Sequence, residues 1–234
     1  MRIIDMLNSS RQMMFENAVS GFEYTARGTC FLCRYAGIDY GITAKHVVDD
    51  YSADDVRILF HQEAREFAPH NAQLTIKIPD TEDTDWADLA FYPLERSQYQ
   101  DRQFAEQLPY LIPGSSHIWQ PGLKGHFILR GFPHDLNAID YEAAIIGQQA
   151  VILEADYFGQ SPMAHCHEIQ FRDISMCRTL DGLSGTPVFW LGEAAPYEHR
   201  FAGLLLRATH TSGRGHFVHA EVILAALDKA MEAK

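Results

Sequence analysis

Ser184 lies in a glycine-rich turn whose residue types suit nucleophilic chemistry. The turn reads Gly182-Leu183-Ser184-Gly185, and the apolar run 187–189 follows it. Glycine adopts backbone angles closed to other residues, so the N–H of Gly182 can point toward the same place as the N–H of Ser184. A hydroxyl beside two converging N–H groups can attack a carbonyl carbon and stabilise the oxyanion that forms. A turn without chemistry is the alternative, because Gly and Ser are common turn residues.

A histidine and an aspartate lie at the ends of two other apolar runs. His46 follows the strand-like residues 41–44, and Asp88 begins a further apolar run. A histidine at a strand end can project into a cleft and act as a base, and an aspartate can accept from its ring N–H and fix its tautomer. Asp85 is the alternative aspartate. A lone histidine is more often structural, but together with Ser184 these residues favour a Ser-His-Asp triad.

The three motifs resemble those of the trypsin-like (chymotrypsin-fold) serine peptidases. That family carries Thr-Ala-x-His, Asp-[Ile/Leu/Val]-Ala and Gly-x-Ser-Gly in this chain order, whereas the same triad on other folds runs in other orders. The matching residues are Thr43-Ala44-Lys45-His46, Asp88-Leu89-Ala90 and Gly182-Leu183-Ser184-Gly185. Asp85 lacks the following Leu-Ala, which favours Asp88. The resemblance covers residues 27–223 and is strongest to short bacterial and viral members without disulfides.

This resemblance implies a serine endopeptidase that hydrolyses polypeptides without a cofactor. His46 would be the base, Asp88 would orient it, and Ser184 would be the nucleophile. The N–H groups of Gly182 and Ser184 would form the oxyanion hole. A catalytically silent relative, used as a binding or scaffold module, is the alternative function.

One departure from the family concerns regulation. In the animal zymogens of this family an aspartate precedes the serine and pairs with a newly cut N-terminus, but here Leu183 occupies that position. We therefore expect no activation by N-terminal cleavage. The oxyanion loop is either formed in advance or ordered by an activating protein partner or by substrate.

The resemblance also implies a first substrate pocket. Its base would be Arg178, six residues before Ser184, and its walls would include Arg207 and His216. Two arginines and a histidine suit an acidic substrate side chain. The alternative is that Arg178 and Arg207 point to solvent.

Many short apolar runs separated by turn residues, without alternating helices, predict an all-β protein. We expect two packed, six-stranded-type antiparallel β-barrels with the triad between them, an N-terminal helix and a C-terminal helix. The expected segments are an N-terminal helix or arm at 1–20, a first barrel with a linker at 21–108, and a second barrel with a helix at 109–234. The expected strands are 27–35, 38–44, 56–62, 73–78, 89–94, 125–133, 143–155 and 168–174. The expected helices are 4–19 and 222–231, the expected loops are 63–72 and 80–85, and the expected linker is 97–108.

Composition narrows the function classes. The formal net charge of −12 disfavours binding to nucleic acid, which needs clustered Lys and Arg. No apolar run approaches the length of a membrane span. The first 17 residues lack the basic start and apolar centre of a secretory signal, so we expect a cytoplasmic protein. There is no phosphate-binding glycine-rich loop followed by Lys and Ser or Thr.

The four cysteines fit a reducing compartment. Cys30 and Cys33 are spaced like metal ligands, but residues three apart on a strand face opposite sides. A zinc site would need the distant segment 165–167 (His-Cys-His) to complete it. We expect four buried thiols, Cys166 and Cys177 included, and no metal.

Overall fold

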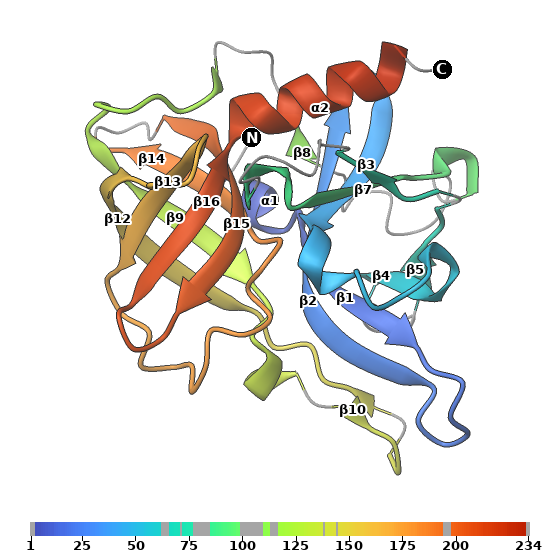
Figure 1. Cartoon of the computed structure of the whole chain (residues 1–234). Helices are drawn as coiled ribbons and strands as arrows, with labels where there is room; N and C mark the ends of the chain where they lie inside the picture. The colour runs from blue at the N-terminus through green and yellow to red at the C-terminus, as the bar shows by residue number, and fades with distance from the viewer. Residues whose placement is uncertain are drawn as a thin grey trace.

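Two antiparallel sheets lie side by side, and a long helix crosses above them (Figure 1). This computed structural model describes residues 3–61, 66–70, 72–76, 85–98, 110–112, 117–137, 139–143, 145–193 and 198–232. The predicted fold class, an all-β chain in two halves with a helix near each end, is confirmed.

The first sheet has eight strands in the part of the chain that the structure describes. Their order is β5-β4-β1-β2-β3-β7-β6, with β8 parallel to β2. The strands are β1 (Ser10–Glu16), β2 (Tyr24–Tyr35), β3 (Ile38–Ala44), β4 (Val56–His61), β5 (Glu66–Ala68), β6 (Leu74–Thr75), β7 (Leu89–Pro93) and β8 (Tyr110–Leu111).

The second half is a closed barrel of six strands, as expected. Neighbouring strands follow the order β12-β13-β16-β15-β14-β9 and return to β12. The strands are β9 (Gly125–Gly131), β12 (Val151–Gln160), β13 (Cys166–Phe171), β14 (Pro187–Gly192), β15 (His199–Thr209) and β16 (Arg214–His219). A separate two-stranded ribbon pairs β10 (Ile139–Asp140) with β11 (Ile145–Ile146).

The N-terminal helix is present but much shorter than the predicted 4–19. Helix α1 spans Ile3–Leu7, and Ser9 Oγ then donates to the carbonyl of Met6 at 2.6 Å. The residues after it form β1, which lies between β2 and β4. Because β1 is a central strand, both of its faces are buried and consecutive apolar residues suit it. Such a run fits a buried strand as well as a helix, which is why the prediction failed.

Four smaller predictions need correction. The strand expected at 143–155 is divided between β11 and β12, and residues 147–150 between them are in no strand. The loop expected at 63–72 contains β5, which pairs with β4. Strand β8 belongs to the first sheet, although the predicted boundary assigns it to the second half. The strand expected at 73–78 is limited to Leu74–Thr75 in the described part, and residues 77–78 lie outside it. Most of the predicted linker at 97–108 and of the acidic loop at 80–85 also lies outside the described residues.

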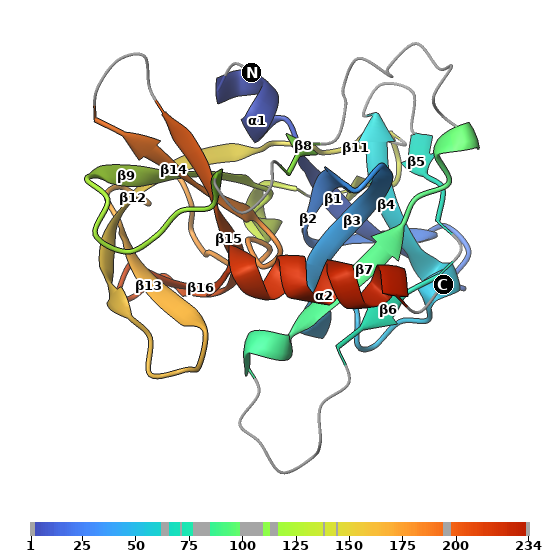
Figure 2. The ribbon, with the colours of Figure 1, turned by 90° about the horizontal axis from the view of Figure 1, so that it is seen from above.

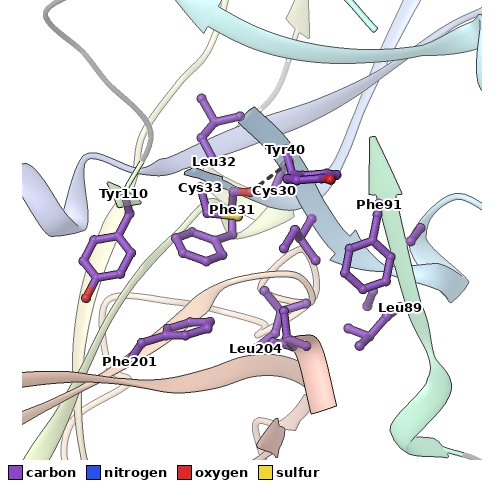
Figure 3. Close-up of a cluster of buried hydrophobic side chains, with 14 of the residues drawn as sticks. Cys30, Phe31, Leu32, Cys33, Tyr40, Leu89, Phe91, Tyr110, Phe201 and Leu204 are labelled. Carbon is purple, nitrogen blue, oxygen red and sulfur yellow. Dashed lines mark hydrogen bonds between the residues drawn. The ribbon is translucent and has the colours of Figure 1, made fainter. Parts of the chain in front are cut away.

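An aromatic cluster joins the two halves. The ring of Phe31, on β2, lies 5.0 Å from that of Phe201 and 6.0 Å from that of Phe189, on β15 and β14. Tyr110, on β8, packs against Phe189 at 5.0 Å. Figure 3 shows Phe31, Tyr110, Phe201 and Leu204 facing one another in this buried contact. Burial of these large side chains holds the halves in a fixed relation.

Helix α2 (Ala220–Glu232) closes the fold close to the predicted 222–231. It buries Ile223, Leu224 and Leu227, and Figure 2 shows it running across the first sheet beside β7. The hydroxyl of Tyr35, on β2, donates to Asp228 at 2.8 Å and ties the helix to that sheet. Neither α1 nor α2, the two α-helices among the described residues, has the length and apolar character needed to cross a membrane.

Candidate functional site

His46 and Asp88 meet because their strands are neighbours. His46 lies in the 3-10 turn Lys45–Val47, directly after β3, and Asp88 lies directly before β7. Strands β3 and β7 are antiparallel, with Ala44 opposite Leu89. The end of one strand and the start of the other therefore lie at the same edge of the sheet.

The carboxylate of Asp88 holds both the backbone and the ring of His46. Asp88 Oδ1 accepts from the His46 N–H at 2.8 Å, and Oδ2 lies 2.5 Å from Nδ1. Burial opposes the charged form of Asp88, but these hydrogen bonds outweigh it and keep the pKa of Asp88 below its ordinary value. The carboxylate therefore stays ionised beside the imidazole and fixes Nδ1 as the donor nitrogen.

Ser184 approaches the same ring from the second barrel. It lies in the turn before β14, and its Oγ is 3.2 Å from His46 Nε2. Gly185 has φ of +88°, and a Cβ there would lie 1.9 Å from the carbonyl oxygen of Thr29. Only glycine fits this close approach between the turn and β2. The result is an unbroken line of hydroxyl, imidazole and carboxylate.

The two N–H groups predicted as an oxyanion hole belong to peptides whose carbonyls are already bound. The Asp181 carbonyl, on the peptide that carries the Gly182 N–H, accepts from the N–H of His134 at 2.8 Å. The Leu183 carbonyl, on the peptide of the Ser184 N–H, accepts from the N–H and hydroxyl of Thr186. Because a planar trans peptide points its N–H away from its carbonyl, both N–H directions are fixed. Neither N–H donates to another residue that the structure describes.

Thr29 is a supporting residue that the sequence analysis missed. It is fully buried on β2, and its Oγ1 donates to the Gly182 carbonyl at 2.8 Å. The same oxygen accepts from the Phe132 N–H at 3.0 Å, and the Thr29 N–H donates to the Ser184 carbonyl at 3.0 Å. A polar residue within a strand, directly before the apolar residues 30–33, was the available signal, but it did not identify the partners.

Leu183 is anchored in the second barrel. It is 1% exposed, belongs to that barrel's apolar core, and packs close to Gly131. An apolar side chain in this place stabilises the turn by burial and cannot form an ion pair.

Asp85, the alternative aspartate, has a different partner. Its Oδ1 lies 3.0 Å from a guanidinium nitrogen of Arg207, on β15. The positive charge of Arg207 also contributes to lowering the pKa of Asp88. Asp85 and Arg207 thus form an ion pair between the two halves, close to Asp88.

The structure does not gather the predicted pocket cations into one group. His216 stands opposite Arg207 across β15 and β16, but its Nδ1 lies 3.3 Å from Ser161 Oγ and 3.8 Å from Glu168 Oε1. The Arg178 side chain is exposed and makes no hydrogen bond or ion pair with any residue in the described ranges.

The cysteines do not contribute to the site. All four are buried and free of disulfides, as expected. Burial raises the pKa of the Cys166 thiol to about 12, which leaves it protonated and unreactive at neutral pH. Within the described part of the chain, no cluster of three or more His, Cys, Asp or Glu residues could hold a metal ion.

This geometry suits a specific kind of chemistry. An imidazole that accepts from a serine hydroxyl and donates to a carboxylate can remove the hydroxyl proton during attack on an electrophilic carbon. Two fixed N–H groups beside the hydroxyl can stabilise an oxyanion.

No model of a known protein family matches the chain, and no curated protein matches it. Solved structures do share its fold. Human heparin binding protein aligns with a TM-score of 0.63 at 10% identity, over 98% of this chain and 94% of that one. A thermostable serine protease, AL20, from an extremophilic microorganism aligns with a TM-score of 0.58 at 13% identity, over 98% and 100%. The protease Anisep from Arthrobacter nicotinovorans aligns with a TM-score of 0.59 at 12% identity, over 97% of this chain and 96% of that one. At these identities the likeness establishes the fold, which is chymotrypsin-like.

Proposed function

We propose that this protein is a serine endopeptidase that cleaves polypeptides through an acyl-enzyme on Ser184. The observation that carries the proposal is the line from Ser184 Oγ to His46 Nε2 at 3.2 Å and from His46 Nδ1 to Asp88 Oδ2 at 2.5 Å. The fold shared with two solved proteases supports the same reaction class.

In the proposed reaction Ser184 Oγ attacks the carbonyl carbon of the scissile peptide bond. His46 Nε2 takes the hydroxyl proton as the new bond forms, and Asp88 stabilises the resulting imidazolium. The N–H groups of Gly182 and Ser184 bind the oxyanion. His46 then protonates the leaving amine, and the C–N bond breaks to leave the acyl-enzyme. A water molecule, deprotonated by His46, attacks the ester and releases Ser184.

The oxyanion loop in this proposal is formed before substrate binds, so an activating protein partner is not required. Its support is the hydrogen bonding of the Asp181 and Leu183 carbonyls, which directs both N–H groups. Thr29 adds a third connection through the Gly182 carbonyl. A preorganised hole costs no rearrangement during the reaction.

A binding module without catalysis is the alternative, since one protein of this fold is named for heparin binding. Heparin is a polyanion, and a chain of formal net charge −12 is poorly suited to it. The alternative also leaves the alignment of Ser184 with His46 without a role.

Labelling with a fluorophosphonate probe tests the proposal. We expect the purified wild-type protein to be labelled without any added partner, and Ser184→Ala and His46→Ala to remain unlabelled. Labelling that survives Ser184→Ala would show that the nucleophile is another residue. Absence of labelling in a folded wild-type protein would favour the binding module, and labelling only after addition of cell extract would favour partner activation.

A further inference from the structure

A cavity of about 590 Å³ lies between α2, β6 and the turn Asp85–Ala87. Figure 2 shows α2 beside β6 and β7, so the cavity lies where the helix crosses the edge of the first sheet. Ser184 and His46 are not among the residues that line it. The cavity is therefore separate from the proposed active site.

The walls of this cavity are mainly apolar. Leu74 and Ile76 line it from β6 and the residue after it, Phe91 from β7, Trp86 from the turn, and Val222 from α2. Trp86 is held by edge-on contact with the His165 ring, at 5.6 Å. Cavities of about 300 to 1,000 Å³ with apolar walls and a few polar groups are typical small-molecule sites.

The charged residues of the wall are not equivalent. The Glu221 carboxylate accepts from Gln120 at 2.9 Å and lies 3.7 Å from His219 Nδ1. The ammonium of Lys229 has no hydrogen bond or ion pair within the described residues. Among the described residues of the wall, Lys229 is therefore available to bind a negatively charged group of a ligand, whereas the Glu221 carboxylate already has partners.

We propose that this cavity binds a small apolar carboxylate, with a hydrocarbon tail against Trp86 and Phe91 and the carboxylate at Lys229. The tail removes apolar wall surface from water, which supplies most of the affinity. The Lys229 ammonium, the one unpaired Lys or Arg cation among the described residues of the wall, selects an anion over a neutral or cationic head group. In a chain with a formal net charge of −12, a general attraction for anions cannot account for such selectivity.

Three ligands with the same ten-carbon tail test the proposal: decanoate, 1-decanol and decyltrimethylammonium. Calorimetric titration uses the wild-type protein, because none of the three ligands contains an ester or amide bond that Ser184 could attack. We expect one saturable site for decanoate. Decyltrimethylammonium should bind at least about tenfold more weakly than decanoate. Equal or tighter binding of the cation, or no saturable decanoate binding, would overturn the proposal.

Two variants locate the site. Lys229→Met should weaken decanoate about fivefold and leave 1-decanol unchanged, whereas Lys124→Met, which removes an exposed lysine outside the cavity, should alter neither. Ala225→Trp, at an exposed helix position on the cavity wall, should abolish binding of both ligands. Decanoate binding that is unaffected by Lys229→Met, or that survives Ala225→Trp in a folded protein, would place the ligand elsewhere.

Discussion

The residues around Ser184 contact one another, whereas the cations predicted to form a substrate pocket contact other groups. His46 lies between Ser184 and Asp88, at 3.2 and 2.5 Å. The guanidinium of Arg207 is instead paired with Asp85 at 3.0 Å. Both aspartates come from the same short stretch of chain, yet one binds the imidazole and the other binds an arginine across the two halves.

The difference between the Ser184 site and the predicted pocket cations follows from the geometry that each function requires. The proposed triad requires three groups at hydrogen-bond distance, so it depends on chain segments that the fold already brings together. A substrate pocket depends on the direction of each side chain, and neighbouring charges can redirect it. His216 faces Glu168, and the Arg178 side chain is exposed, so neither is committed to a common pocket.

The largest expected effect comes from Asp88→Asn. The amide keeps the shape of the carboxylate but can donate toward Nδ1, which favours the wrong tautomer of His46. We expect kcat to fall by about 10⁴-fold in peptide hydrolysis, with the protein still folded. A loss of less than tenfold would show that Asp88 does not orient or stabilise the His46 imidazole during catalysis.

A middle effect is expected from Thr29→Val, which removes the hydroxyl bound to the Gly182 carbonyl and the Phe132 N–H. The free energy of unfolding should fall by about 1–3 kcal/mol, because two buried groups lose their partner. The value of kcat, corrected for active sites titrated with the probe, should fall about ten- to a hundredfold with KM nearly unchanged. Thr29→Ser keeps the hydroxyl and should restore kcat. A variant with lower stability but normal kcat would limit Thr29 to a structural role.

The smallest effect is expected from Asp85→Asn, which releases Arg207 from its ion pair. The kcat/KM ratio for peptides with acidic over neutral side chains should rise about three- to tenfold, and overall activity should stay within a few-fold of wild type. Asp50→Asn is the matched control, because Asp50 also faces an arginine, Arg27, in an exposed pair. An unchanged ratio would show that Arg207 does not face the substrate.

Much of the fold could be predicted from the sequence because hydrophobic periodicity and turn residues mark strands strongly. The largest failure concerns β1, where the consecutive residues Met13, Met14 and Phe15 are buried in the middle of a sheet. Because apolar and polar residues do not alternate in this run, its pattern fits a helix as well as a strand. Pairing with β2 and β4 makes it a strand. Nothing local in the sequence specifies those neighbours.

Some residues of the candidate site could likewise be predicted from the sequence, and others could not. Ser184, His46 and Asp88 could be predicted because each lies in a short motif beside an apolar run. Thr29 and His134 could not, since they act through backbone hydrogen bonds to a turn about 150 and 50 residues away in the chain. Contacts of this kind depend on how the two halves pack, which the sequence pattern does not encode.

The proposed triad is divided between the two halves, so its three residues are synthesised and folded at different times. A growing polypeptide emerges from its N-terminal side, so His46 and Asp88 leave the ribosome before Ser184 is made. A chain that has folded only its first sheet holds a base and a carboxylate without a nucleophile. Hydrolysis then becomes possible only after the second barrel docks through Phe189 and Phe201. Under the proposed function, a nascent chain therefore has no complete triad until Ser184 has been made and the second barrel has folded.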